Sequence, residues 1–335
     1  MKLSKVLSTL VPAALLALQV GPALAADKVK IAMVVKSLGN GFFDAAHEGG
    51  NEAAKELGDV ELIYTGPTTA TAEGQIEILN ALIGQKVDAL VISANDKDAL
   101  VPIAKKAAQR GIKVISFDSG IAQEGRLLQL NPSNNALIGT KLVQMAADGA
   151  GGGGGEIAIL SATAQATNQN IWIAEMKKVL AKPENSKLRL VATVYGDDQS
   201  DKSYREALGL LRSNPNLKVI VAPTTVGINA AAKAVADEKL IGKVYVTGLG
   251  LPSEMAGHVM NGSVKSFAIW NPIDLGYSAT YVAYQFVKGK ATGKQGEQIA
   301  AGRMGKITVE ANGEAAMAQP FTFDKSNVEK FAKMF

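Results

Sequence analysis

The sequence predicts an α/β protein made of two doubly wound, Rossmann-like lobes. From Lys28 onward, short β-branched runs alternate with amphipathic stretches of helical spacing, a pattern typical of parallel sheets covered by helices. The same rhythm restarts after Leu130. The chain of 335 residues also exceeds what one hydrophobic core usually serves, so two domains are expected.

The amino-terminal segment has the pattern of a secretory signal peptide. Two lysines precede an apolar run over residues 6–20, and the small-residue motif Ala-Leu-Ala ends at Ala25. The run is shorter than the roughly 20 residues of a membrane-spanning helix and contains Pro12, which disfavours a membrane anchor. We therefore expect residues 1–25 to be removed and the protein to reach the periplasm.

The composition disfavours several classes of partner. Without residues 1–25, which carry two lysines, 33 basic and 31 acidic residues remain, so the mature chain is nearly neutral. Such a balance favours neither nucleic acid nor an acidic lipid surface. The chain has no cysteine and hence no disulfide. His47 and His258 lie in predicted helices without a second ligand at metal spacing, so we expect no metal and no cofactor.

The first lobe is predicted from three strand and helix repeats followed by a fourth strand. Short β-branched and aliphatic runs favour strands, whereas apolar residues every three or four positions favour helices. In order, the expected elements are a strand over 30–35, a helix over 42–58, a strand over 60–64, a helix over 71–85, a strand over 87–93, a helix over 98–111 and a strand over 113–117.

The second lobe repeats this alternation after residue 130. It is expected to contain helices over 134–149, 170–182, 200–213, 227–238 and 253–260, and strands over 156–162, 188–195, 218–223, 243–249 and 264–270. The elements assigned from the pattern end at residue 270.

Two motifs are better explained by structure than by ligand binding. The run from Gly149 to Gly155 follows a helix and precedes a strand, the reverse of a phosphate-binding loop, so it is predicted to be a connector. Asp197, Asp198 and Asp201 cluster before a helix. We interpret them as part of the helix start rather than as a calcium site.

Ligands of open parallel sheets bind beyond the carboxyl ends of the strands. The side chains expected there mix charged, amide, hydroxyl and aromatic groups. This mixture suits a polyol, whose hydroxyls need forked hydrogen-bond partners and whose apolar ring face needs an aromatic surface. The residues are Lys36, 93–96, Asp118, Ser119, 162–169, 223–225, 248–250, Trp270 and Asn271.

Lys36 and Asp118 are the strongest candidates, because each is a lone charge that ends an otherwise apolar strand of the same lobe. Such charges either pair with each other or meet a ligand, and we favour ligand contact. Phe42 and Phe43 begin a predicted helix at the same edge of the sheet. They are equally compatible with the core and with the cleft.

Two long segments of the first lobe carry a family resemblance: VVKSLGNGFFDAAHEGGNEAAKELG and VDALVISANDKDALVPIAKKAAQRGIKVISFDSG. They resemble the type I periplasmic sugar-binding proteins, the group that includes the ribose-binding protein. Four further segments are LSATAQATNQNIWIAEMKKVL, VATVYGDDQSDKSYREALGLL, VTGLGLPSEMAGHV and SFAIWNPIDLGYSATYVAY. These look like the rhamnose-binding proteins of ABC transporters, whose neighbours are the autoinducer-2 receptors.

The resemblance covers nearly the whole mature chain and implies its division into lobes. The chain is expected to cross between the lobes three times, near Leu130, near Asn271 and near Gly305. The expected first lobe comprises residues 26–130 and 272–305, and the expected second lobe comprises residues 131–271 and 306–335.

The resemblance also implies ligand contacts in the first lobe. Asn40, Phe42 and Phe43 match the Asn-x-Phe-Phe with which other members hold and stack on the sugar. Asp118 matches the acid that takes two sugar hydroxyls, whereas Ser119 stands where ribose binders have arginine.

The similarity to autoinducer-2 receptors is incomplete. Four residues agree with the ligand contacts of those receptors: Lys36, Asp118, Gln169 and Pro223. Asn168 replaces a second aspartate, and Thr225 replaces an alanine. Losing a carboxylate removes a charge-assisted acceptor, which argues against autoinducer-2.

Two further positions argue against ribose. Gly250 stands where ribose binders have aspartate, and Trp270 stands where they have glutamine. A tryptophan face with fewer charged acceptors suits a deoxysugar with a methyl group. We therefore expect L-rhamnose as the ligand. The alternatives are autoinducer-2 and another neutral monosaccharide.

The expected function is capture and delivery of a small neutral sugar, not catalysis. A sugar that touches both lobes binds the closed form better, and a membrane permease can recognise that form. A sugar-responsive transcription regulator shares the two lobes, but it would begin with a helix-turn-helix rather than a signal peptide. Presentation of the sugar to a chemoreceptor would use the same pocket, so the sequence does not separate it from delivery.

Overall fold

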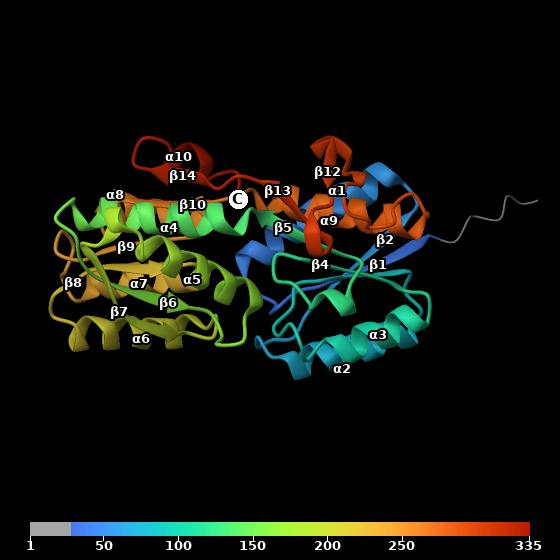
Figure 1. Cartoon of the computed structure of the whole chain (residues 1–335), viewed down its shortest axis with the longest axis horizontal. Coiled ribbons are helices and arrows are strands. Elements are labelled where there is room, and N and C mark those ends of the chain that lie inside the picture. The colour runs from blue at the N-terminus through green and yellow to red at the C-terminus, as the bar shows by residue number, and fades with distance from the viewer. Residues whose placement is uncertain (1–27) are drawn as a thin grey trace, which may run out of the picture.

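The computed structural model describes residues 28–335, which form two α/β lobes side by side (Figure 1). The predicted signal peptide, residues 1–25, lies outside the described residues. Each lobe contains a parallel sheet with helices packed on it, so the predicted fold class is confirmed. Within residues 28–335, no helix combines the length and the apolar character needed to cross a bilayer.

The first lobe is built on a six-stranded sheet in the order β13-β5-β4-β3-β1-β2, in which every neighbouring pair is parallel. Its strands are β1 (Val29–Val34), β2 (Val60–Thr65), β3 (Ala89–Ile92), β4 (Lys113–Phe117), β5 (Leu128–Ser133) and β13 (Glu314–Ala318). Its helices are α1 (Gly41–Leu57), α2 (Ala72–Gly84), α3 (Val101–Gln109) and α9 (Pro272–Val287).

Alternation along β1 explains why both faces of this sheet are covered. Ile31 and Met33 belong to the core that includes residues of α1 and α9. Ala32 and Val34 belong to a separate core with residues of α2 and α3. Because successive side chains of a strand point to opposite faces, one nearly continuous apolar run fills both cores.

Two glycines allow α1 and α9 to pack closely against each other. A Cβ atom on Gly49 of α1 would overlap the carbonyl oxygen of Ile273, and one on Gly276 of α9 would overlap the carbonyl oxygen of Ala46. Only glycine permits this approach of the two backbones. α9 is an element that the sequence pattern does not predict.

The second lobe contains a four-stranded parallel sheet in the order β7-β6-β8-β9. β10 (Ser266–Ile269) lies next to β9 through single parallel bridges and pairs with β14 (Phe321–Asp324) in antiparallel fashion. The other strands are β6 (Gly155–Ser161), β7 (Leu188–Tyr195), β8 (Leu217–Ala222) and β9 (Tyr245–Gly248). The helices are α4 (Asn135–Ala150), α5 (Thr167–Leu180), α6 (Ser200–Ser213), α7 (Thr225–Asp237), α8 (Pro252–Asn261) and α10 (Val328–Phe331).

The third crossing between the lobes lies later in the chain than predicted. β13 forms the edge of the first sheet, where Ala315 lies opposite Leu130. The chain reaches the second lobe only at β14. Assignment of residues 314–318 to the second lobe is therefore wrong, because β13 continues the first sheet. The crossings near Leu130 and Asn271 stay proposals.

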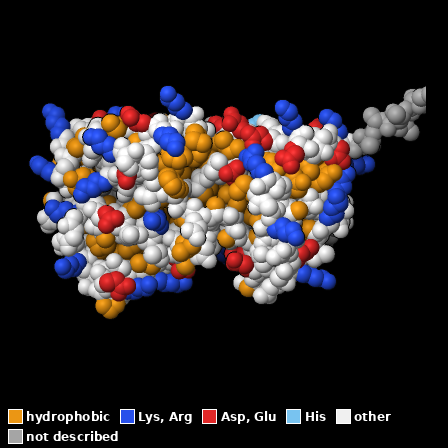
Figure 2. Space-filling model, turned by 90° about the horizontal axis from the view of Figure 1, so that it is seen from above, with side chains coloured by type: hydrophobic (Ala, Val, Ile, Leu, Met, Phe, Trp, Pro, Cys, Tyr) orange, Lys and Arg blue, Asp and Glu red, His pale blue; other side chains and the backbone are white. Residues whose placement is uncertain are grey.

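Two smaller features complete the fold. Residues 151–154 join the end of α4 to β6, so the glycine run is a connector, as predicted. A short hairpin of β11 (Gln298–Ala300) and β12 (Lys306–Thr308) follows α9. Figure 2 shows basic and acidic side chains scattered among hydrophobic ones over one long face, in keeping with the balanced charge of the chain.

Candidate ligand-binding site

A cavity between the two lobes is lined by residues that follow strands of both sheets. This is the edge at which ligands of doubly wound sheets bind. Ten of the twelve predicted ligand-binding residues line this cavity: Lys36, Asn40, Phe42, Phe43, Asp118, Asn168, Gln169, Pro223, Thr225 and Trp270. The first five come from the first lobe and the other five from the second.

Asp118 holds the centre of the charged wall. It follows β4 directly and has φ +57°, a left-handed conformation that aspartate tolerates better than most residues. Ser93 Oγ donates to Asp118 Oδ2 over 2.8 Å, and Asn168 Nδ2 donates to Asp118 Oδ1 over 3.0 Å. The carboxylate thus joins the two lobes through Asn168.

Burial governs the ionisation of this carboxylate. Removal from water raises the pKa of Asp118 above the ordinary value of an aspartate. The Lys36 charge and the hydrogen bonds from Ser93 and Asn168 oppose that rise, whereas the Asp198 carboxylate adds to it. Lys36 Nζ lies 3.8 Å from Asp118 Oδ2, longer than a hydrogen bond, so the two charges attract without being locked together.

Buried amides fix the strand ends that carry this pair. Gln75 Nε2 donates to the carbonyl oxygens of Val35 and Ser93 over 3.0 and 2.7 Å. Asn95 Nδ2 donates to Lys36 O over 2.9 Å, and its backbone N–H donates to Gln75 Oε1 over 2.9 Å. These bonds connect the ends of β1 and β3 through side chains. The charged wall is therefore preorganised.

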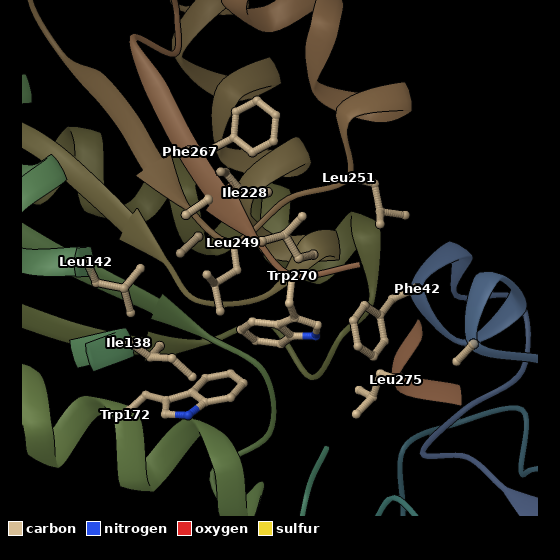
Figure 3. Packing of buried hydrophobic residues seen from close by; sticks show 14 of the residues in the cluster. Phe42, Ile138, Leu142, Trp172, Ile228, Leu249, Leu251, Phe267, Trp270 and Leu275 are labelled. Carbon is tan, nitrogen blue, oxygen red and sulfur yellow. The ribbon is translucent and has the colours of Figure 1, made fainter. Parts of the chain in front are cut away.

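Aromatic side chains form the opposite wall. Figure 3 shows Trp270 between Trp172 of α5 and Phe42 of α1. The ring centroids of Trp270 lie 5.6 Å from Trp172 and 6.2 Å from Phe42, and the latter pair is perpendicular. Trp270 Nε1 is buried and has no hydrogen-bond partner among residues 28–335. An apolar face and a free donor therefore coincide in one side chain.

The polar groups of the second lobe differ in how much capacity they keep for a ligand. Gln169 Nε2 donates to Pro223 O over 2.6 Å, and Gln169 Oε1 accepts from Ser161 Oγ over 3.2 Å. The amide of Gln169 is thus largely engaged by the protein. Asn168 uses Oδ1 for the backbone N–H of Gln169 and Nδ2 for the aspartate of the first lobe. Of these two side-chain bonds, the one to Asp118 joins the lobes and the one to Gln169 lies within the second lobe.

A second interlobe contact lies at the start of α1. Asn40 caps the helix by accepting from the backbone N–H of Phe42 over 3.0 Å. Thr225 Oγ1 of the second lobe lies 3.5 Å from the same Asn40 Oδ1. This contact places a hydroxyl group of the second lobe on a helix cap of the first lobe.

Two predicted residues, Ser119 and Gly250, do not line this cavity, and their contact with a ligand stays a prediction. Ser119 is buried behind Asn168, whose backbone N–H lies 3.4 Å from Ser119 Oγ. Gly250 packs against Met255 and Ile228, where a Cβ atom would be crowded. In both cases residues of the second lobe pack directly against the predicted residue.

Three lining residues are absent from the sequence prediction: Trp172, Asp198 and Ile269. Thr224 and Leu249, which also line the cavity, belong to the strand-end stretches 223–225 and 248–250 that the sequence singled out. Asp198 is the important one, because it brings a carboxylate from the second lobe and accepts a hydrogen bond from Thr224 Oγ1. It was expected only as part of a helix start. Its position three residues after β7 was the available signal, since the rule for strand ends applies there too.

The remaining titratable candidates have structural surroundings. His47 stacks on Tyr64 with ring centroids 4.1 Å apart, and His258 lies 2.9 Å from Asn229 Oδ1. In the part of the chain from residue 28 onward, no group of three or more histidine, aspartate or glutamate side chains is arranged to hold a metal ion.

Residues 31–291 match the sequence profile of the periplasmic binding protein domain. The chain belongs to this family. Among curated relatives of this periplasmic binding protein is the D-ribose/D-allose-binding protein of Pseudomonas aeruginosa. It is 30% identical over 235 residues, which are 66% of this chain and 70% of that protein.

Two solved structures are similar over nearly the whole chain. An ABC transporter solute-binding protein from Clostridium phytofermentas with bound L-rhamnose is 40% identical, has a TM-score of 0.88 and covers 92% of this chain and 100% of its own. LsrB from Clostridium saccharobutylicum, in complex with AI-2, has a TM-score of 0.85 and covers 90% of this chain and 99% of its own. Its 21% identity shows a shared fold alone.

These findings establish the general function. The protein is a sugar-binding protein of an ABC transporter, and its relatives are binding proteins for transport rather than enzymes. Membership of the family implies a small sugar as ligand, a transporter permease as partner and the periplasm as location.

Proposed function

We propose that the protein binds L-rhamnose between its lobes and delivers it to the permease of an importer. The observation that carries this proposal is the 40% identity, over 92% of the chain, to a solute-binding protein with bound L-rhamnose. That identity is about twice the one to the AI-2 complex.

We also propose cleavage after Ala25, so that the mature protein begins at Ala26.

The charged wall suits vicinal hydroxyl groups. Asp118 accepts two hydroxyls in the proposed complex, and Lys36 donates to a neighbouring ring oxygen while it stabilises the carboxylate. Asn168 gives up its bond to Asp118 and meets the sugar instead. Burial raises the pKa of Asp118, which means that the carboxylate lacks the stabilisation that water would give it. Sugar hydroxyls that donate to this carboxylate supply that stabilisation, so their hydrogen bonds contribute to affinity.

The aromatic wall suits the deoxy character of rhamnose. Trp270 and Phe42 offer apolar surface to the ring face and the methyl group, whereas a C6 hydroxyl there would lose its hydrogen bonds to water. The unpartnered Nε1 of Trp270 gains an acceptor when a ring hydroxyl lies beside it. Both effects favour a 6-deoxy sugar over its hydroxylated relatives.

Binding is coupled to closure because the contacts come from both lobes. A sugar held by Asp118 of the first lobe and Trp270 of the second stabilises the closed form. The closed form then presents one fixed surface to the permease. Small-angle scattering should give a smaller radius of gyration with rhamnose than without it. An unchanged radius at saturation would contradict closure.

Titration calorimetry on the mature protein tests the ligand directly. L-rhamnose is expected to bind more tightly than D-ribose, D-galactose or autoinducer-2. A thermal-shift screen with the same compounds should rank them in the same order, since a ligand that binds only the native state raises its apparent stability. Tighter binding of autoinducer-2 than of rhamnose would overturn the proposal in favour of signal uptake.

A further inference from the structure

A second cavity adjoins the sugar cavity and is larger than it, with a volume of about 250 Å³. Asp118 and Asn168 line both cavities, and their side chains are joined by a hydrogen bond of 3.0 Å. The pair therefore forms a partition between the two spaces. The second cavity is lined by residues of both lobes, including β5 and the start of β13 next to a lobe crossing.

The first-lobe wall of this cavity is a network of polar side chains. Gln129 Nε2 donates to Asn131 Oδ1 over 3.1 Å, and Asn131 Nδ2 donates to Glu314 Oε2 over 2.8 Å. Arg126 Nη2 lies 3.6 Å from Glu314 Oε1. Such a set can bind sugar hydroxyls, because amide side chains both donate and accept, an arginine donates and a carboxylate accepts.

The second-lobe wall contains a polar group without a partner. Thr167, the first residue of α5, lines the cavity and is 8% exposed. Its Oγ1 is buried and has no hydrogen-bond partner within residues 28–335. An orphaned hydroxyl in a folded protein indicates an absent partner, such as a ligand hydroxyl or a water. Ile121 and Ile171 add apolar surface to the same cavity.

The partition opens with the cleft. Asp118 belongs to the first lobe and Asn168 to the second, so separation of the lobes breaks their bond without disturbing either lobe. A ligand that enters the open cleft can then lie across the position of this bond. On closure the two side chains would contact it from opposite sides, as they contact each other here.

We propose that the second cavity is a subsite for a second glycosyl residue, so that the ligands of this protein include disaccharides that contain rhamnose. The rhamnose unit occupies the sugar cavity, the glycosidic link passes between Asp118 and Asn168, and the second ring meets Thr167 and the Gln129 network. The proposal rests on the proposed function, because it assumes rhamnose in the first cavity.

Calorimetry with L-rhamnose and with the linkage isomers of rhamnosyl-rhamnose tests the subsite in the mature protein. At least one isomer is expected to bind more tightly than rhamnose. Thr167→Val removes only the hydroxyl and should weaken binding of that isomer about fivefold, the loss that one buried hydrogen bond predicts. Binding of rhamnose itself should stay unchanged, since Thr167 does not line the sugar cavity.

A second variant fills the cavity instead of removing a bond. Ala122 is half-buried and lines only the second cavity, so Ala122→Trp should abolish the preference for the disaccharide and spare rhamnose. Ala136→Trp, on the exposed face of α4, is the matched control and should change neither. Thermal unfolding of each variant checks that it is folded.

The possible outcomes separate the two proposals. If rhamnose binds but every disaccharide is rejected, the cavity holds only water and the subsite is wrong. If a disaccharide binds equally well to Ala122→Trp, its second ring lies elsewhere, which also overturns the subsite. If rhamnose gives no heat with the unaltered protein, the proposed ligand is wrong and the subsite falls with it.

Discussion

The two walls of the cleft use different chemistry. The first-lobe wall carries the buried pair of Lys36 and Asp118, held by amides that tie strand ends together. The second-lobe wall offers Trp270 with an unpartnered Nε1 and Asn168 with an exchangeable bond, next to the Asp198 carboxylate. The difference indicates a division of labour. If the proposed function holds, we expect the first wall to supply most of the affinity through charge and the second wall to supply most of the discrimination through its aromatic surface and its amide and indole donors.

The largest effect is expected at Asp118. Asp118→Ala removes the charged fork and leaves Lys36 buried without its partner, so rhamnose affinity should fall at least about a hundredfold. Calorimetry measures the loss, and thermal unfolding confirms that the variant is folded. Asp118→Asn is the control that keeps the shape. Normal binding by Asp118→Ala would show that the first wall is not the source of affinity.

Acidic pH should weaken the first wall without any mutation. Hydroxyl donors favour the carboxylate, so affinity should fall up to about tenfold per pH unit below the pKa of Asp118. Because burial raises that pKa, the fall should begin at a higher pH than for an ordinary aspartate. The free energy of unfolding of the free protein changes in the opposite direction. Because the pKa of Asp118 is higher in the folded state, its contribution to stability is present at low pH and is lost as the pH rises through the folded-state pKa. Asp118→Asn should remove both dependences.

Asn168→Asp tests discrimination by the second wall. The new carboxyl group would lie beside Asp118, so one of the two would hold a proton. The interlobe hydrogen bond would then run from a carboxylic acid to a carboxylate instead of from an amide to a carboxylate. We expect rhamnose affinity to fall about tenfold while the ratio of autoinducer-2 to rhamnose affinity rises. Competition titration measures the ratio. An unchanged ratio would remove Asn168 from the specificity determinants.

The smallest effect is expected for a matched pair of tryptophans. Trp270→Phe keeps an apolar face but loses a donor that has no partner, so rhamnose affinity should fall about fivefold while stability changes little. Trp172→Phe loses a donor that is bonded to Asn135 Oδ1 over 2.9 Å, so it should reduce stability more than affinity. Equal behaviour of the two variants would contradict the role of the Trp270 N–H.

Much of the fold was predictable because its signals are local. Apolar runs identify the strands, and residues such as Lys36 and Asp118 follow them directly. β13 was not predictable in this way. Its sequence EAAMA lacks β-branched residues, and it is a strand only because it pairs with β5, more than 180 positions earlier in the chain.

Site residues that directly follow a strand were also predictable, whereas those placed by long-range packing were not. Trp172 lies inside a helix, and it reaches the cavity only because of how α5 is rotated and where Trp270 packs. Ser119 follows Asp118 directly, yet it points behind Asn168 because successive residues diverge at a strand end. Chain position alone therefore identifies the edge of the sheet, but not which of two adjacent side chains faces the ligand.

The close packing of α1 and α9 gives mutations outside the cleft a route to the ligand. α9 begins one residue after Asn271, where the chain leaves the aromatic wall, and α1 begins at the Asn40 cap. Gly49 and Gly276 each lie against the backbone of the facing helix, so a displacement of one helix displaces the other. Gly49 lies about two helical turns from Phe42, which lines the cavity. We expect a methyl group at Gly49 to push α1 away from α9, to shift Phe42 and so to change sugar affinity. Positions that line no cavity can therefore affect the sugar site through the backbone of α1.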